Sequence, residues 1–374
     1  MLSVAHFVQV APKRAGLYET TREIAWAQRE YLNWDARLVD VTGIVTGVGN
    51  PIKEGEDRGV PIADLDWSRK ADVHFLHSGI PSAVEGTRPV FYFAHGLPEY
   101  VFYSQMMVEV STDPNIRKDR ANRTPFNGPW SLITTLGKKE FMKGAITLWK
   151  RHSYYLEPYF NKVILSNHFC KLEDFTPEGK GIEYRTPASE DGLNITFSDH
   201  WRYSAFKDPF QVLHGARKFC KDTGSRIHLY ALPKDEIQHL HHPWNSILHG
   251  VGGTTDDESL PHVIGDLHTI HEDIAAVHRT ADLLITPSCD DTRTVLEASA
   301  CGCPVLARHG TDGALFHCRM EDPEDVDRVL RSIYDGITKQ GKDLEFRKRS
   351  RALAESFQLE DAVKKIEAGM MEVL

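Results

Sequence analysis

The sequence of 374 residues is poor in cysteine and has no long hydrophobic run. Its six cysteines are scattered, which argues against a disulfide framework and favours reduced thiols. No apolar run approaches the roughly 20 residues that a membrane span needs. The opening residues MLSVAHFVQVAPKRAG also lack the basic segment and cleavage site of an export signal. We therefore expect a cytoplasmic protein with no transmembrane segment.

An excess of positive charge is also missing, because the formal net charge is -9. The whole chain therefore gives no general reason to expect nucleic acid or an anionic membrane as a partner. Residues 113–151 are an exception, with nine basic and three acidic side chains, a local excess of six positive charges. Aromatic residues are interleaved with these charges: Trp130, Phe141, Trp149, Tyr154 and Tyr155.

The length predicts two domains, each of roughly 150 to 200 residues. Short apolar runs alternate with helical patterns in both halves, which is typical of parallel sheets built from βαβ units. We expect an α/β protein with two Rossmann-like, doubly wound domains, residues 1–188 and 189–345, facing a central cleft. A final helix within 346–374 would pack back on the first domain. Ligands of such sheets bind at the carboxyl ends of the strands.

The stretch DDTRTVLEASACGCPV, residues 290–305, follows the apolar run ADLLITPS and predicts the start of a helix. Asp290 and Asp291 would be explained equally well by helix capping or by ligand binding. The Cys-x-Cys pair has no second Cys/His pair nearby, so buried packing is favoured over a metal site. Glu297 is expected in the first turn of this helix. An unpaired carboxylate there would be costly unless a ligand hydroxyl meets it.

The segment ITFSDHWRYSAFKDPF begins the second predicted domain and places Arg202 five residues before Lys207. Two cations beside a helix N-terminus suit a diphosphate, because fixed N–H groups and mobile charges converge on one anion. The alternative is a pair of solvated surface charges.

Two residues of the first half follow predicted strands. Gly16 opens the first helix in APKRAGLYETTRE, where it would allow close approach to a ligand or form only a turn. His95, in PVFYFAHGLPEY, lies at a strand end, facing the cleft or packed in the structure.

Several of these segments resemble one known family. TVLEASACGCPVLA is similar to the "LEAMACGTPVVA" region of GT-B glycosyltransferases of family 4, and HEDIAAVHRTADLLITPS to the helix and strand before it. The spacing of Arg202 and Lys207, the Gly16 loop and the FAHG motif also have counterparts there. The matches run in the family's order from about residue 8 to 335 and are poor between residues 100 and 160.

The resemblance implies a retaining, metal-independent hexosyl- or pentosyltransferase that uses a nucleotide diphosphate sugar, expected to be a UDP-sugar. Arg202 and Lys207 would hold the diphosphate, and Glu297 would accept hydrogen bonds from the ribose. Backbone N–H groups near Thr294 and Val295 would contact phosphate. His95 would lie beside the transferred sugar, and Gly16 would let the first domain approach the diphosphate.

The sequence departs from the family pattern at two positions. Cys289 occupies the place of the first Glu, which contacts the donor sugar in the family, and the loop is two residues shorter. Asp290 or Asp291 could supply that carboxylate. Trp201 replaces the glycine before Arg202.

The acceptor is expected on the first domain, near residues 113–151. Basic and aromatic side chains there suit an anionic polymer, including hydroxylated bases in DNA, or an anionic surface; the alternative is a solvated excursion that covers the sheet. A sugar-nucleotide epimerase and a catalytically silent donor-binding subunit are the alternative functions. The candidate acceptor residues are Lys138, Lys139, Lys143 and Trp149.

Overall fold

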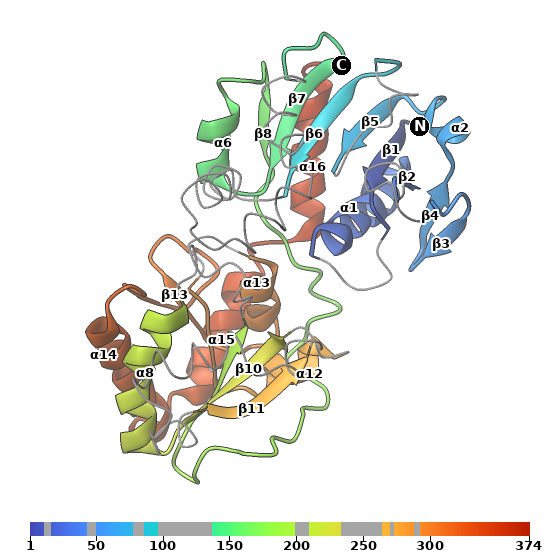
Figure 1. Cartoon of the computed structure of the whole chain (residues 1–374). Helices are drawn as coiled ribbons and strands as arrows, with labels where there is room; N and C mark the ends of the chain where they lie inside the picture. Colours follow the sequence, from blue (N-terminus) through green and yellow to red (C-terminus); the bar gives the residue numbers. More distant parts are fainter. Residues whose placement is uncertain are drawn as a thin grey trace, which may run out of the picture. The chain divides into compact units, whose positions relative to one another are not determined.

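The computed structural model divides the chain into two compact units, each described by itself. Unit 1 comprises Met1–His168 and Leu359–Leu374, and unit 2 comprises Phe169–Gln358 (Figure 1). The division falls 20 residues before the predicted boundary after residue 188, because β8 is the last strand of the first sheet. The structure describes residues 1–10, 16–42, 50–77, 86–95, 137–198, 209–232, 264–269, 273–287 and 292–374.

Unit 1 is built on an eight-stranded sheet with the order β3-β4-β2-β1-β5-β6-β7-β8. All neighbouring strands are parallel except β3 and β4, which form an antiparallel pair. The strands are β1 (Ser3–Val8), β2 (Asp35–Asp40), β3 (Gly55–Asp57), β4 (Val60–Ala63), β5 (Val73–Leu76), β6 (Val90–Ala94), β7 (Met142–Thr147) and β8 (Val163–Leu165). The helices are α1 (Gly16–Leu32), α2 (Leu65–Ser68), α6 (Lys150–Leu156) and α16 (Leu359–Met371).

The central strands of unit 1 are buried on both faces, so their sequences are continuous apolar runs rather than alternating ones. Helix α1 packs against β1 and β2, and α16 packs against α1 and β8 (Figure 1). The close approach of α16 depends on Gly369, because a Cβ there would lie 2.7 Å from the Ile164 side chain. Helix α6 adds Leu156 to a cluster with Tyr92.

Unit 2 is built on a six-stranded, fully parallel sheet with the order β11-β10-β9-β12-β13-β14. Its core cluster joins the sheet to helices α8 and α14, whereas α12, α13 and α15 contribute to separate buried clusters. The strands are β9 (Asn194–Ser198), β10 (Arg226–Leu232), β11 (Ile264–Thr269), β12 (Leu283–Ile285), β13 (Val305–Arg308) and β14 (Phe316–Cys318). The helices are α8 (Pro209–Thr223), α12 (Ile274–Thr280), α13 (Arg293–Ala300), α14 (Pro323–Tyr334), the π-helical turn η3 (Asp335–Lys339) and α15 (Asp343–Ala354).

The mixed α/β class and the two parallel, doubly wound sheets confirm the fold class predicted from the sequence. Within the described residues, no helix is both long and apolar enough to cross a membrane.

Helix α8 lies close to the start of α14 at Gly215. A Cβ on Gly215 would lie 2.5 Å from the Pro323 carbonyl oxygen and 2.8 Å from the Val326 Cβ. We predict that Gly215→Ala lowers the free energy of unfolding by about 1 to 2 kcal/mol, because overpacking outweighs the better helix propensity of alanine. Urea denaturation would measure the change. Lys218→Ala, on the exposed side of the same helix, is the matched control and should lie within about 0.5 kcal/mol of the wild type.

The sheet of unit 1 contains buried histidines, which make stability depend on pH. Burial lowers the pKa of His6 to about 4 and that of His77 well below its ordinary value. A depressed histidine pKa means that the unfolded chain binds the proton more tightly, so stability is complete above pH 6.5 and is lost as the pH falls below it. We predict that His6 alone lowers the free energy of unfolding by about 2 kcal/mol when the pH falls from 8 to 5.

Urea denaturation at a series of pH values would test this slope. His6→Gln should flatten it, whereas His214→Gln, on the exposed face of α8, should keep the wild-type slope. An equal slope in wild type and His6→Gln would contradict the prediction.

Candidate functional site

The strand order of unit 2 places a topological switch point between β9 and β12. From β9 the chain proceeds to β10 and β11 on one side, and β12 then pairs in parallel with the other side of β9. Open α/β sheets bind ligands at such a point, outside the carboxyl ends of the strands. The chain that follows β9 carries Arg202 and Lys207, and the chain that follows β12 leads to Glu297.

Helix α13 follows β12 and carries the predicted carboxylate. Thr292 is its N-cap, and the Thr292 side chain accepts a hydrogen bond of 3.5 Å from the Val295 amide. The helix begins at Arg293, so Glu297 lies in the second turn. The expectation of a first-turn position was wrong, because Arg293 already belongs to the helix and Glu297 is therefore its fifth residue.

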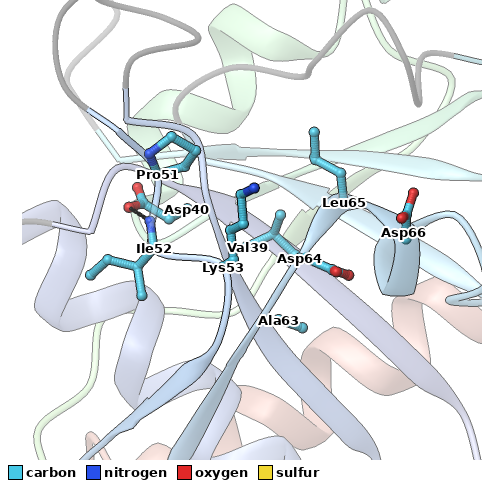
Figure 2. A pocket seen from close by; sticks show the side chains of 9 residues that line it. All are labelled: Val39, Asp40, Pro51, Ile52, Lys53, Ala63, Asp64, Leu65 and Asp66. Atoms are coloured by element: carbon cyan, nitrogen blue, oxygen red, sulfur yellow. Dashed lines mark hydrogen bonds between the residues drawn. The ribbon is translucent and has the colours of Figure 1, made fainter.

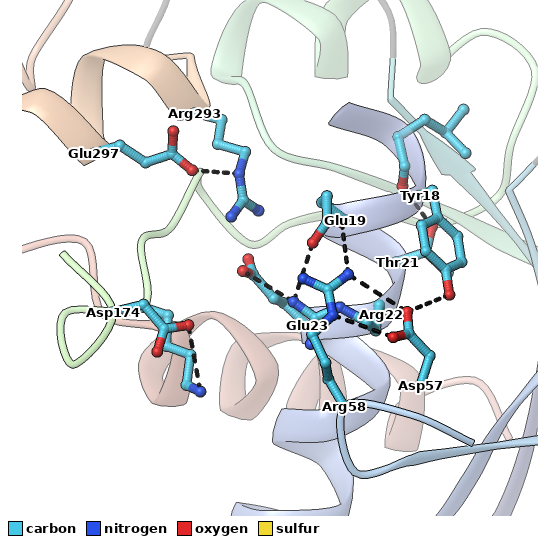
Figure 3. Close-up of polar contacts among 12 residues, drawn as sticks. Tyr18, Glu19, Thr21, Arg22, Glu23, Asp57, Arg58, Asp174, Arg293 and Glu297 are labelled. Carbon is cyan, nitrogen blue, oxygen red and sulfur yellow. Dashed lines mark hydrogen bonds and ion pairs between the residues drawn. The ribbon is translucent and has the colours of Figure 1, made fainter. Parts of the chain in front are cut away.

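Glu297 is 7% exposed and forms an ion pair with Arg293, one turn earlier on the same helix (Figure 3). The expectation that a ligand hydroxyl must balance this carboxylate therefore has to be revised, because a guanidinium already does so. A carboxylate has two oxygens with about four lone-pair sites, so it can accept from a guanidinium and from a hydroxyl together. Sequence reasoning missed Arg293, although the i,i+4 spacing on a predicted helix was a usable signal.

The backbone amides predicted to contact phosphate lie at the start of α13. The Val295 amide is engaged by the Thr292 cap, and Thr294 precedes it in the first turn of α13. Four predicted residues lie outside the described residues: Arg202, Lys207, Asp290 and Asp291.

Unit 1 has its own switch point, between β1 and β5. The chain turns from β1 to β2 on one side, and β5 pairs in parallel with the other side of β1. Gly16 is the first residue of α1, the helix that follows β1. His77 directly follows β5 and His95 directly follows β6, so both lie at the carboxyl edge of the sheet.

His95 is partly buried, and its Nε2 lies 2.6 Å from the Nδ1 of His77. Its ring stacks on Phe93 at a centroid distance of 4.6 Å. Burial, with a further contribution from the nearby His168, lowers the pKa of His95 to about 3. The imidazole is therefore neutral at physiological pH and can donate from one nitrogen and accept with the other.

An ion-pair cluster that the sequence did not reveal surrounds the first turns of α1. Glu19 pairs with Arg22 at 3.1 Å and with Arg58 at 2.6 Å, and Asp57 accepts a hydrogen bond of 2.6 Å from the Tyr18 hydroxyl (Figure 3). Burial raises the pKa of Glu19, but Arg58 and Arg22 outweigh this effect and leave it below its ordinary value. These contacts connect the β3–β4 turn to the start of α1.

The structure does not bring the four candidate acceptor residues together. Lys138 and Lys139 precede β7, and Lys143 is its second residue, so all three lie at the amino end of the strand. Trp149 follows the carboxyl end of β7, where its ring lies 5.4 Å from that of His168. Only Trp149 therefore shares the sheet edge of His95.

A hollow of about 230 Å³ lies near β2 and β4 of unit 1 (Figure 2). Its Asp40 carboxylate accepts hydrogen bonds from the Ile52 amide at 2.8 Å and from Thr42. Asp64 caps α2 through the Trp67 amide at 2.8 Å. The third carboxylate of its lining, Asp66, pairs with Arg69 at 3.0 Å. All three carboxylates thus have structural partners.

The described cysteines behave as packing residues. Cys301 and Cys303 are buried, and burial raises the pKa of each thiol to about 12. Among the described ranges, no group of three or more His, Cys, Asp or Glu side chains could hold a metal ion.

Comparisons with known proteins identify the fold. No family model and no curated protein match the sequence. Among solved structures, the Anabaena protein HepE in complex with UDP and glucose is 14% identical, with a TM-score of 0.63 and full coverage of both chains. A glycosyltransferase from Rickettsia africae is 11% identical, with a TM-score of 0.63 over 100% of this chain and 98% of that one.

A third similar structure is the E. coli trehalose-6-phosphate protein bound with UDP-2-fluoro glucose. It is 9% identical, with a TM-score of 0.62 over 100% of this chain and 99% of the other. These likenesses extend over both units and agree with the two parallel sheets. The chain has the GT-B fold, as its sequence predicted.

Proposed function

We propose that the protein is a glycosyltransferase that moves a sugar from a nucleoside diphosphate donor to an acceptor hydroxyl. One observation carries the proposal: β9 and β12 are neighbours at the switch point, and the segments after them carry two cations and a carboxylate. A nucleoside diphosphate needs the same combination, because its phosphates attract cations and its ribose hydroxyls donate to a carboxylate. The Anabaena structure with UDP and glucose supports a UDP-sugar as the donor.

The donor side chains have separate roles in this proposal. Arg202 and Lys207 hold the diphosphate and stabilise the negative charge that grows on it as the glycosidic bond breaks. Glu297 accepts hydrogen bonds from the ribose hydroxyls while Arg293 keeps it ionised and oriented. The Thr294 amide, near the positive end of the α13 dipole, donates to phosphate.

We propose that the reaction is metal-independent and retains the anomeric configuration. Arg202 and Lys207 supply two positive charges beside the leaving group, which is the charge that a divalent ion would otherwise bring. Retention is implied by the family resemblance. Asp290 or Asp291 takes the place of the carboxylate that the family directs at the donor sugar, since Cys289 stands at that position.

Unit 1 is proposed to bring Gly16 to the diphosphate and His95 to the transferred sugar. Both follow parallel strands at the carboxyl edge of the sheet. Trp149, at the same edge, is the proposed acceptor contact. An aromatic face at a basic segment suits an anionic polymer such as a nucleic acid with an exposed base. Lys138, Lys139 and Lys143 are left out of this contact because they lie at the amino end of β7.

We predict that a UDP-sugar raises the thermal unfolding temperature of the wild type. A donor at about 100 times its Kd stabilises the folded state by about 2.7 kcal/mol. Lys207→Ala and Glu297→Ala should each weaken donor binding at least roughly tenfold, because each removes a charged hydrogen bond of about 1.5 to 3 kcal/mol. Calorimetry across a panel of nucleoside diphosphate sugars would measure the affinities.

Lys218→Ala is the matched control, since it removes an exposed lysine from α8 and should bind donor like the wild type. Unchanged donor binding in both Lys207→Ala and Glu297→Ala would place the donor elsewhere. Turnover of donor without any acceptor would instead identify an epimerase, and tight binding with no turnover would identify a silent subunit. The anomeric proton signal of the product decides between retention and inversion.

A further inference from the structure

Four side chains form a continuous line of hydrogen bonds from the interior of unit 1 to its carboxyl edge. The Gln28 Oε1 of α1 lies 2.7 Å from the Nε2 of His6, and the Nδ1 of His6 lies 2.9 Å from the Nε2 of His77. The Nδ1 of His77 then lies 2.6 Å from the Nε2 of His95. We call these four residues the histidine relay. Only its last member belongs to the proposed sugar site.

The strand pairing explains why the three histidines lie on one face of the sheet. His6 of β1 is in register with Phe75 of β5, and Phe75 is in register with Phe91 of β6. His77 and His95 follow two and four residues later on their strands, so the alternation of side chains puts all three imidazoles on one face of the sheet. Contact with Gln28 identifies this face as the one that α1 covers.

Apolar rings flank the relay. The ring of His6 meets the edge of Phe75 at 4.8 Å, and Phe93 stacks on His77 at 4.9 Å and on His95 at 4.6 Å. His6 and Gln28 are fully buried, and His77 is 6% exposed. Burial lowers the pKa of each of the three histidines, as described above. Every imidazole of the relay is therefore neutral and has one N–H donor and one bare nitrogen.

In a chain of hydrogen-bonded neutral imidazoles, every ring must donate its N–H in the same direction along the chain. The Gln28 oxygen only accepts, so the Nε2 of His6 carries the hydrogen and its Nδ1 is bare. That bare Nδ1 accepts from His77 Nε2–H, and the bare Nδ1 of His77 accepts from His95 Nε2–H. The Nδ1 of His95 is then left without a hydrogen and acts as a hydrogen-bond acceptor. The Nε2–H form is also the more stable tautomer of a free neutral histidine, so both effects act together.

We propose that Gln28, acting through His6 and His77, fixes the tautomer of His95 so that its Nδ1 accepts a hydrogen bond from a hydroxyl of the donor sugar. Gln28, His6 and His77 are positioning residues, because they act on the sugar only through His95. The sugar contact rests on the proposed function, whereas the tautomer is a property of the free protein. The site would then favour a donor whose hydroxyl at that position is present and able to donate.

A turn of the Gln28 amide would reverse the relay. Its Nε2 is buried and has no hydrogen-bond partner among the described residues. If the amide turned over, this nitrogen would donate to His6, every imidazole would change tautomer, and His95 would present Nδ1–H instead. The orientation of one buried amide thus decides whether the sugar site offers an acceptor or a donor.

Nitrogen NMR on the ligand-free, full-length protein tests the tautomer directly. Long-range proton–nitrogen spectra of ¹⁵N-histidine-labelled wild type, assigned by the loss of signals in His6→Gln, His77→Gln and His95→Gln, should show Nε2–H at all three positions. Gln28→Lys places a donor at His6 and should convert His95 to Nδ1–H. A wild-type His95 with Nδ1–H, or with mixed tautomers, overturns the proposal even if Gln28→Lys does not fold.

Donor kinetics test the link to the sugar. His77→Phe leaves His95 Nε2–H without an acceptor against an apolar ring, and this cost exceeds the intrinsic preference for the Nε2–H form, so His95 shifts to Nδ1–H. The donor KM should therefore rise roughly fivefold, the loss of about one hydrogen bond, with kcat nearly unchanged. His74→Phe is the matched control, because His74 is a buried histidine of the same strand on the opposite face and bonds only the Ser68 carbonyl in the described residues. It should keep the wild-type KM.

The two measurements separate the possible failures. An equal KM in His77→Phe and wild type, with the donor bound and turned over, overturns the role of the relay in sugar recognition. Failure of every nucleoside diphosphate sugar to bind, together with Nε2–H at His95, overturns the proposed function and leaves the tautomer lock standing.

Discussion

The parallel pairing of β9 with β12 is the constraint on which the proposed donor site depends. Parallel strands deliver their following segments to one edge of the sheet, whatever the distance between them in the sequence. Leu283 pairs with Ile195, almost 90 residues away, and this register brings the carboxyl ends of β9 and β12 to the same edge. Buried clusters on both faces of β12 hold the register, because a slip by one residue would move Leu283 and Ile285 into the cluster that packs Leu284 and disrupt the packing of both.

The buried carboxylates of Glu297 and Glu19 are balanced by local ion pairs rather than left for a ligand hydroxyl to balance. Arg293 lies one helical turn from Glu297, and Arg58 forms an ion pair with Glu19 near the start of α1. A buried carboxylate without such a partner would bind a proton and lose its value as an acceptor. The cost of this arrangement is that a ligand hydroxyl competes with a guanidinium, which favours ligands that bring several donors at once, as a ribose does.

Features that depend on a local residue pattern could be predicted from the sequence. Apolar runs separated by helical periods predicted both sheets, and the position of Glu297 followed from a strand and a helix close together in the chain. Glu297 was predicted one turn too early in α13, because the residue pattern does not show that the helix already includes Arg293. The three lysines near β7 were grouped with Trp149 by composition alone, and composition cannot tell which end of a strand a residue occupies.

Contacts between distant residues had no such signal. His6 is hydrogen-bonded to His77, 71 residues away in the sequence, and to Gln28, 22 residues away. In the sequence, nothing distinguishes these two histidines from the other 17, or Gln28 from any glutamine of a helix. The register of β1 with β5 brings His6 to His77, and the packing of α1 on β1 brings Gln28 to His6.

A relay of this kind carries a thermodynamic cost that a purely apolar core would avoid. Each buried imidazole gives up water for hydrogen bonds of similar strength, so the net stabilisation is small, about 1 kcal/mol for each bond. Protonation of the unfolded chain then removes stability as the pH falls. Apolar residues in place of His6, His77 and Gln28 would remove this loss of stability at low pH. They would also remove the hydrogen bond that fixes the tautomer of His95. The histidine relay is therefore better explained by control of the tautomer at the proposed sugar site than by stability of the fold.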